Sequence, residues 1–399
     1  MKVERFLFAL LHYAICGGEV NAQTVADCTS ENLQAAYSLA QKHDLAHMIA
    51  QVLEKLDFPD SDQMKKLKNA KMKAIYRYAR MSYEYEQLCK TLEDAEIPYV
   101  PLKGSVLRVY YPEPWMRTSG DIDVLVHEND LAAAVNALEG CGWTTDNKRV
   151  CHDISLHSAS GVHLELHFKI TENMDNIDPV LKKVWDYSCP APGKRYEYMQ
   201  TNEYFLFHHI AHMSYHFIAG GCGIRPVLDL WILKNRMKWD EEKLADLLKE
   251  ARLEKFYECI TELMHCWFEG AAYSQRIQKM EDYILQGGTY GILSNKILVE
   301  QAAAGSSRTH LRQRILQPYD MLSSYYPILK RYKWLTPLFQ VVRWIRVFQT
   351  GRFRNSVYEL KVNQSISADQ TQEIKLFLAD IGLSGIRRST QTQLDDAKE

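Results

Sequence analysis

Two aspartates in the first half of the chain have the spacing of a metal-binding pair. Asp121 and Asp123 alternate with the apolar residues Ile122, Val124 and Val126, which predicts a β-strand. Successive side chains of a strand point to opposite faces, so both carboxylates project from one face and the apolar residues are buried on the other. Two neighbouring carboxylates repel each other unless a cation compensates them, and hard oxygen ligands select Mg²⁺ or Mn²⁺. The pair therefore predicts a divalent-cation site, while this spacing alone leaves a solvated strand edge as the alternative.

A later strand carries a third acidic residue on its polar face. In residues 162–168 the apolar positions alternate with His163, Glu165 and His167, and residues 152–158 form the other half of a hairpin around Ser160-Gly161. An acidic residue on an adjacent strand would complete a site of three carboxylates. We therefore expect Glu165 to be the third metal ligand.

A short basic segment with a glycine precedes the aspartate strand. Lys103, Gly104 and Ser105 lie between a predicted strand at 99–102 and a short predicted helix that begins at Ser105. The N-terminus of a helix presents free N–H groups and a partial positive charge to a phosphate, and Lys103 and Arg117 add cations. The simpler interpretation is a strand-to-helix turn in which Ser105 caps the helix. A phosphate site beside a dicarboxylate site would suit the chemistry of nucleoside triphosphates.

These motifs together resemble a known family. Leu-Lys-Gly-Ser at 102–105, Tyr-Pro-Glu-Pro-Trp-Met-Arg at 111–117 and Asp-Ile-Asp-Val-Leu-Val at 121–126 are similar to the signature of the uncharacterised bacterial nucleotidyltransferases, a branch of the DNA-polymerase-beta-like superfamily. The resemblance implies that Gly104 and Ser105 bind the triphosphate, that Asp121 and Asp123 bind metal, and that Glu165 is the third carboxylate.

The resemblance continues past the strands. His167 matches a histidine that this branch carries two residues after the third acid, and 212–230 resembles its His-x-x-x-His and Gly-Arg-Asp segment. His208, His212 and His216 share one helix face, as do Arg225 and Asp229 on the next helix. Three interpretations remain open for this group: zinc chelation by His212 and His216, hydrogen bonds between packed helices, or a lid over the nucleotide or acceptor in which Asp229 orients Arg225.

Composition places the chain among ordinary globular proteins. It has 399 residues, of which 46% are hydrophobic and 25% charged, and its net charge is −2. These values exclude disordered, collagen-like and disulfide-scaffold classes, and the charge gives no reason to expect nucleic acid as a partner. A run of lysines at 65–73 is a solvated helix face or, alternatively, a basic groove. Nine cysteines without a CxxC pair are typical of a reducing compartment.

The hydrophobic pattern predicts an α+β fold, in which a small mixed nucleotidyltransferase sheet is flanked by N-terminal and C-terminal helical regions. We expect a helical region at 1–97, the catalytic core at 98–200, a helical domain at 201–350 and a partly disordered segment at 351–399, with the last ten residues disordered. Apolar residues at the start of the chain follow helical spacing, which favours an amphipathic helix over a signal peptide. No segment has the ~20 apolar residues of a membrane span, so we expect a cytoplasmic protein without a membrane partner.

The function that these observations predict is Mg²⁺-dependent or Mn²⁺-dependent transfer of a nucleoside monophosphate from an NTP, with ATP the expected donor, to a hydroxyl or amine acceptor, with release of pyrophosphate. Glu165 would serve as general base, while Lys103 or Arg117 offsets developing charge. Two alternatives remain: a non-catalytic nucleotide-binding or sensing scaffold, and a toxin-like enzyme that modifies a protein or tRNA.

Overall fold

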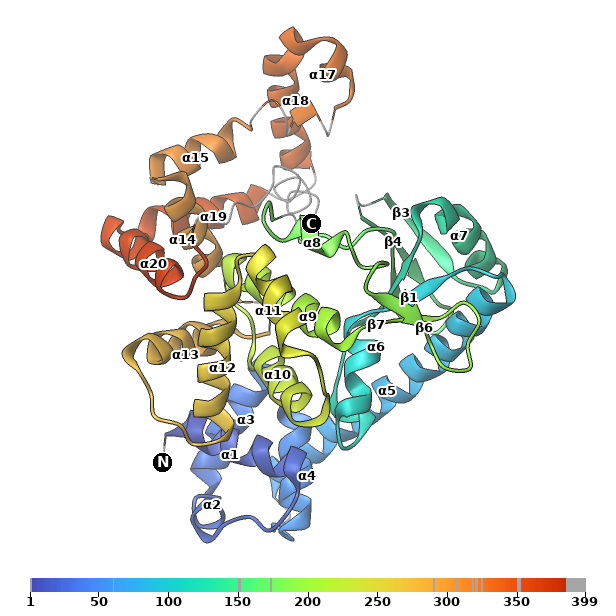
Figure 1. Ribbon diagram of the computed structural model, residues 1–399. Coiled ribbons are helices and arrows are strands. Elements are labelled where there is room, and N and C mark those ends of the chain that lie inside the picture. Colours follow the sequence, from blue (N-terminus) through green and yellow to red (C-terminus); the bar gives the residue numbers. More distant parts are fainter. Residues whose placement is uncertain are drawn as a thin grey trace.

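A small mixed sheet lies on one side of a largely helical molecule in the computed structural model (Figure 1). The structure describes residues 2–384 except for positions 60, 150–151, 173, 290, 306, 318, 320–321, 324–325 and 350–352. Helices precede and follow the sheet along the chain, which confirms the predicted α+β class. The last ten residues, for which the sequence predicts disorder, lie outside the described residues.

The chain begins with five helices, of which the last is the longest. α5 continues for 33 residues because its sequence contains no glycine or proline, and the Ser61 side chain caps it by accepting a hydrogen bond from the Met64 N–H. The five helices have these bounds: α1 Val3–Cys16, α2 Ala22–Ala26, α3 Ser30–Lys42, α4 Ala46–Lys55 and α5 Asp62–Asp94.

The sheet has the strand order β1-β2-β5-β4-β3. Its central pair, β2 and β5, is parallel, and each other pair is antiparallel. β1 lies at an edge of the sheet. Its last residue, Pro101, has no N–H to donate, and an edge strand tolerates this. The strands have these bounds: β1 Tyr99–Pro101, β2 Asp121–Val126, β3 Thr144–Arg149, β4 Asp153–His157 and β5 His163–His167.

One face of the sheet is apolar and is covered by two helices. The inward residues of β2 and β5 form one buried cluster with side chains of α5 and of α7 (Leu131–Gly140). This cluster includes Ile122, Val124 and Leu164 together with Leu88 of α5 and Leu138 of α7. Alternation along the strands places Asp121 and Asp123 on the opposite face, as the sequence predicts.

The helices after the sheet share a second core with the N-terminal helices. Phe8 of α1, Phe207 of α9 and Phe256 of α12 belong to the same buried cluster. The elements from the sheet onward have these bounds: α6 Lys103–Leu107, η1 Arg108–Tyr110, η2 Pro114–Met116, η3 Glu128–Asp130, α8 Asp178–Leu181, β6 Ser188–Pro190, β7 Tyr198–Gln200, α9 Asn202–Ile218, α10 Ile224–Arg236, α11 Glu241–Glu250, α12 Glu254–Phe268, α13 Gln275–Gly287, α14 Leu293–Ala304, α15 Ser307–Ile315, α17 Ile328–Arg331, η4 Lys333–Leu335, α18 Thr336–Gln349, α19 Phe353–Ser365 and α20 Ala368–Asp380.

Within the segment 351–399, which the sequence predicts to be partly disordered, α19 and α20 are helical, and residues 385–399 lie outside the described residues. Across the described part of the chain, no helix has the length and apolarity needed to cross a membrane. The eight cysteines that the structure describes are all free thiols, and Cys151 lies outside the described residues.

Candidate functional site

The three predicted carboxylates meet on the polar face of the sheet. The parallel register of β2 and β5 places Asp123 opposite Glu165 and Asp121 opposite His163. Oxygen or nitrogen atoms of Asp121, His163 and Glu165 lie within 4.8 Å of one another, and the same holds for Asp123, Glu165 and His167. Glu165 belongs to both groups, so the strand pairing alone brings all three acids to one place.

Two cations compensate the most buried of these acids. Lys103 Nζ donates to Asp123 Oδ1 at 3.0 Å, and His167 Nε2 lies 3.0 Å from the same oxygen and 3.4 Å from Glu165 Oε2. Burial alone would raise the pKa of Asp123, but Lys103 and His167 outweigh it and hold that pKa well below its usual range. Burial opposes the charged form of His167 as well, yet its hydrogen bonds with Asp123 and Glu165 raise its pKa to about 9. The imidazolium and the ammonium therefore occupy the negative centre of the site.

Asp121 receives no such compensation. Burial, followed by the charges of Asp123 and Glu165, raises its pKa to about 6. At pH 7 three carboxylates with hard oxygen atoms thus face one another at a cost in stability, and this is the donor set that a divalent cation prefers. The residues present fit such an ion: Asp121, Asp123 and Glu165 would supply oxygen, and His163, or His167 once the ion displaces its proton, would supply nitrogen.

The segment around Gly104 is tied closely to these strands. Lys103 has a φ of 42°, which is rare for a residue with a side chain, and the Leu102 N–H donates to the Asp123 carbonyl. A Cβ atom on Gly104 would lie 3.1 Å from Ser119 Cβ, so the close approach of the two segments requires a residue without one. The Ser105 N–H donates to the Leu102 carbonyl at 3.3 Å and is therefore already engaged within the turn.

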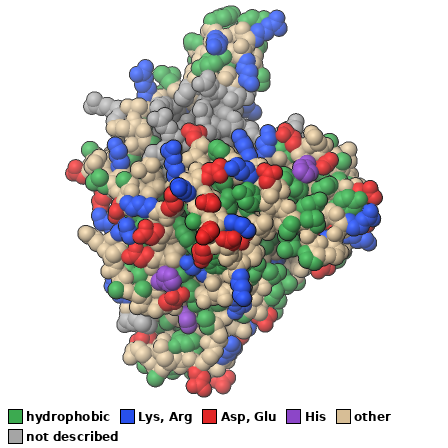
Figure 2. All heavy atoms as spheres, in the orientation of Figure 1, with side chains coloured by type: hydrophobic (Ala, Val, Ile, Leu, Met, Phe, Trp, Pro, Cys, Tyr) green, Lys and Arg blue, Asp and Glu red, His purple; other side chains and the backbone are tan. Residues whose placement is uncertain are grey.

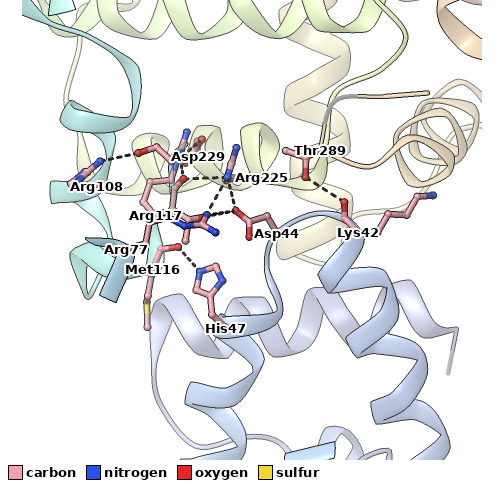
Figure 3. Close-up of polar contacts among 12 residues, drawn as sticks. Lys42, Asp44, His47, Arg77, Arg108, Met116, Arg117, Arg225, Asp229 and Thr289 are labelled. Carbon is pink, nitrogen blue, oxygen red and sulfur yellow. Dashed lines mark hydrogen bonds and ion pairs between the residues drawn. The ribbon is translucent and has the colours of Figure 1, made fainter. Parts of the chain in front are cut away.

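Arg117 lies beside this turn, but its charge is held by a carboxylate of α10. Its Nε donates to Asp229 Oδ1 at 2.8 Å, and the hydroxyl of Tyr111 donates to the same oxygen at 2.7 Å. Asp229 is fully buried, and although burial raises its pKa, the Arg117 guanidinium lowers it below the usual value overall. Figure 3 shows Arg117 and Asp229 facing each other between the two segments.

The structure corrects the predicted partner of Arg225. Asp229 orients Arg117, whereas Arg225 Nη1 lies 3.3 Å from Asp44 Oδ2 and donates to the Thr118 carbonyl at 3.2 Å (Figure 3). The sequence suggested Arg225 because it lies one helical turn from Asp229. Arg117 is more than a hundred residues away along the chain, and only the packing of α10 against the 111–118 segment brings it close.

The histidines of α9 form a hydrogen-bonded chain with an acid that sequence reasoning missed. Glu172, which is buried, lies with Oε1 2.7 Å from His212 Nδ1, and His212 Nε2 lies 3.0 Å from His216 Nε2. Burial and the neighbouring Lys103 lower the pKa of His212 to about 3. Burial and His212 also lower the pKa of His216 to about 3, so both rings are neutral at pH 7. Among the described residues, the groups able to hold a metal include none of these histidines, which does not support the zinc interpretation.

A fourth acid on the polar face was also missed. Asp153 of β4 pairs with His167 in the antiparallel register, and its ligand atom lies within 4.8 Å of those of His152 and His167. Asp153 is 5% exposed, and its Oδ1 accepts no hydrogen bond. The signal was present in the alternation of Asp153, Ser155 and His157, which places these residues on the face of Glu165.

The comparisons with known proteins agree with the site. The family model described as "Uncharacterised nucleotidyltransferase" matches residues 29–269, which is well over half of the chain and includes the sheet, the Gly104 turn, α9 and α10. None of the curated proteins compared with the chain matches it.

Proposed function

We propose that this chain, which belongs to the uncharacterised nucleotidyltransferase family, transfers a nucleoside monophosphate from an NTP to a hydroxyl or amine acceptor and releases pyrophosphate. The observation that carries the proposal is the meeting of Asp121, Asp123 and Glu165 on one sheet face beside Lys103. Family membership supports a nucleotide substrate, and the uncompensated Asp121 supports a requirement for a divalent cation.

The three acids would hold Mg²⁺ or Mn²⁺. A divalent ion in such a site polarises the phosphoryl oxygens and stabilises the charge of the leaving pyrophosphate. Glu165 would accept the proton of the attacking hydroxyl or amine, because its carboxylate lies on the same sheet face as the two aspartates. A cation on Asp123 would also free Lys103, whose ammonium then reaches a phosphate oxygen of the triphosphate.

The opposite wall of the site would bind the acceptor. His212 and His216 are neutral, so they donate and accept hydrogen bonds and do not serve as cations for phosphate. Glu172 fixes the orientation of the His212 ring through Nδ1. We assign Arg117 the role of a positioned cation near the Gly104 turn, since Asp229 holds its guanidinium in one orientation. Arg225 is assigned to the same wall, where Asp44 and the Thr118 carbonyl hold it.

The proposal is tested with labelled NTPs. Each NTP is first screened with Mg²⁺ for its effect on the melting temperature, and the NTP that stabilises the protein is then incubated with cell lysate and protein. Mass spectrometry identifies the acceptor that gains a nucleoside monophosphate, and pyrophosphate release gives the rate. The double variant Asp121→Asn with Asp123→Asn is expected to lower the rate by at least about 10³-fold, since metal ions contribute several kcal/mol to such reactions.

Asp146→Asn is the matched control. Asp146 lies on β3 of the same sheet, but it is exposed and forms an ion pair with His157 at 3.6 Å. Transfer that survives the double substitution at a near-normal rate would disprove the metal role. Binding of an NTP without pyrophosphate release for any acceptor would favour the non-catalytic alternative.

A further inference from the structure

The segment that contains α17, η4 and α18 is rich in basic residues and lacks acidic ones. From residue 321 to residue 358 the sequence contains seven Lys and Arg residues and no Asp or Glu, within a chain whose overall charge is close to zero. The basic residues are Lys330, Arg331, Lys333, Arg343, Arg346, Arg352 and Arg354. The same stretch contains Trp334 and Trp344 and many further aromatic residues. Figure 2 shows basic and hydrophobic side chains together on the lobe that projects from the molecule here.

The outer face of α18 is apolar and exposed. Leu338, Val341 and Ile345 are 51–56% exposed and recur at helical spacing, and Trp334, just before the helix, is 76% exposed. Arg346 is exposed on the same helix, beside this row. A second exposed row, Met72, Tyr76 and Tyr83, lies on α5, while the row here contains four large apolar residues, one of them a tryptophan.

The inner face of the same helix already has its partners. The rings of Phe339 and Tyr326 lie 4.7 Å apart, and Gln340, which is buried, donates through Nε2 to the Gln317 carbonyl at 2.7 Å. The Trp344 indole N–H donates to the Ile315 carbonyl at 3.2 Å. These contacts fix the rotation of α18 about its axis, so the apolar row faces outward because of the packing of the helix.

We propose that α18 and the segment before it bind the surface of an anionic lipid membrane, with Trp334, Leu338, Val341 and Ile345 inserted among the lipids and the basic residues on their head groups. A helix with an apolar face bordered by lysine and arginine, and with tryptophan at its end, lies in the plane of a membrane interface. The expectation of no membrane partner rests on the absence of a spanning segment, and a surface helix needs none.

The charge and the exposed apolar row together favour an anionic membrane over a second copy of the chain or a nucleic acid. A second copy of the chain would bring the five described basic residues of this segment against the same five, because a two-fold contact places identical surfaces together. A nucleic acid would use the cations but would leave the apolar row in water. An anionic bilayer satisfies both features at once. This surface is separate from the carboxylate site, so the inference does not depend on the proposed nucleotide transfer.

The test is flotation of the full chain with lipid vesicles. The protein is expected to float with phosphatidylcholine vesicles that contain about 30% phosphatidylglycerol, and to bind pure phosphatidylcholine at least about tenfold more weakly. Raising NaCl from about 0.1 M to about 0.5 M should weaken binding by about tenfold, since the charges are screened. The double variant Leu338→Glu with Ile345→Glu should lose at least about tenfold in affinity, because acidic groups replace the inserted side chains.

Leu376→Glu is the matched control, since Leu376 is a similarly exposed apolar residue on α20, which carries acidic residues, and its replacement should leave binding unchanged. The milder pair Lys330→Gln with Arg331→Gln tests the charge without acidic side chains and should weaken binding by several fold. Three results would overturn the inference: no flotation with anionic vesicles at low salt, equal binding by the Leu338 and Ile345 variant, or a dimer in solution that the same variant dissociates.

Discussion

Buried charges occur in two neighbouring regions of this molecule and behave in opposite ways. In the first region, which we call the arginine–aspartate contact, Arg117 and Tyr111 both donate to Asp229 between the 111–117 segment and α10. In the second, the carboxylate face, three acids share two cations and Asp121 remains uncompensated. A buried charge of the first kind holds the fold together, while one of the second kind costs stability and forms a site for a ligand.

The largest effect is expected at the arginine–aspartate contact. Asp229→Asn would leave the Arg117 guanidinium buried against a neutral amide, which should lower the free energy of unfolding by about 3–5 kcal/mol. Urea denaturation measures this change. Asp380→Asn, at an exposed ion pair whose atoms lie 3.9 Å apart, is the control and should change it by less than about 0.5 kcal/mol. A loss below about 1 kcal/mol for Asp229→Asn would remove the contrast between the two regions.

The next largest effect is stabilisation of the carboxylate face by metal. Mn²⁺ at about 100 times its dissociation constant should raise the free energy of unfolding by about 2.7 kcal/mol, because it binds only the folded protein. The same addition should not stabilise Asp123→Asn, and it should stabilise Asp146→Asn as fully as the wild type. Denaturation with Mn²⁺ and then with EDTA provides the measurement. Equal stabilisation of wild type and Asp123→Asn would show that the ion binds elsewhere.

The raised pKa of Asp121 predicts how the free energy of unfolding changes with pH. Its pKa is about 6 in the folded protein and about 3.9 in the unfolded chain, so between these values the folded state binds more protons and the free energy of unfolding falls as the pH rises. Without metal, Asp121→Asn should therefore stabilise the protein by about 2 kcal/mol at a pH of about 8, and the gain should vanish at a pH of about 4. Destabilisation at both pH values would mean that Asp121 is well compensated.

The smallest effect concerns the third member of the arginine–aspartate contact. Tyr111→Phe removes the hydroxyl that donates to Asp229 at 2.7 Å, and it should cost about 1 kcal/mol, since Arg117 still pairs with the acid. Tyr76→Phe, on the exposed side of α5, should change the free energy of unfolding by less than about 0.5 kcal/mol. A cost above about 3 kcal/mol for Tyr111→Phe would show that the hydroxyl, and not the guanidinium, satisfies Asp229.

The carboxylate face could be predicted because it depends on local periodicity. The alternation of Asp121 and Asp123 with apolar residues determined which face they occupy, and the hairpin that contains Glu165 followed from the turn at Ser160-Gly161. Asp153 shows the same alternation with Ser155 and His157 on β4. Where chemistry follows the two-residue period of a strand, the sequence is sufficient.

The arginine–aspartate contact could not be predicted in the same way. Helical spacing suggested Arg225 as the partner of Asp229, but the structure pairs Asp229 with Arg117, from a segment that lies between two strands. The contact of Glu172 with His212 could not be predicted for the same reason, since the two residues are forty positions apart and α8, β6 and β7 lie between them. Contacts between distant segments depend on how helices pack, and this is not encoded in the spacing of any one segment.

By itself the sequence determined the α+β class, the faces of the strands and the acids that could bind a cation, because these features depend on side-chain alternation over a few residues. Tertiary structure decided which charges are compensated. Lys103 and His167 contact Asp123, whereas Asp121 has no such partner and repels the neighbouring acids. Asp229 pairs with Arg117, which is distant from it in the sequence. The energy of a buried charge depends on the groups within a few ångströms of it in space, and folding brings those groups from any position in the chain.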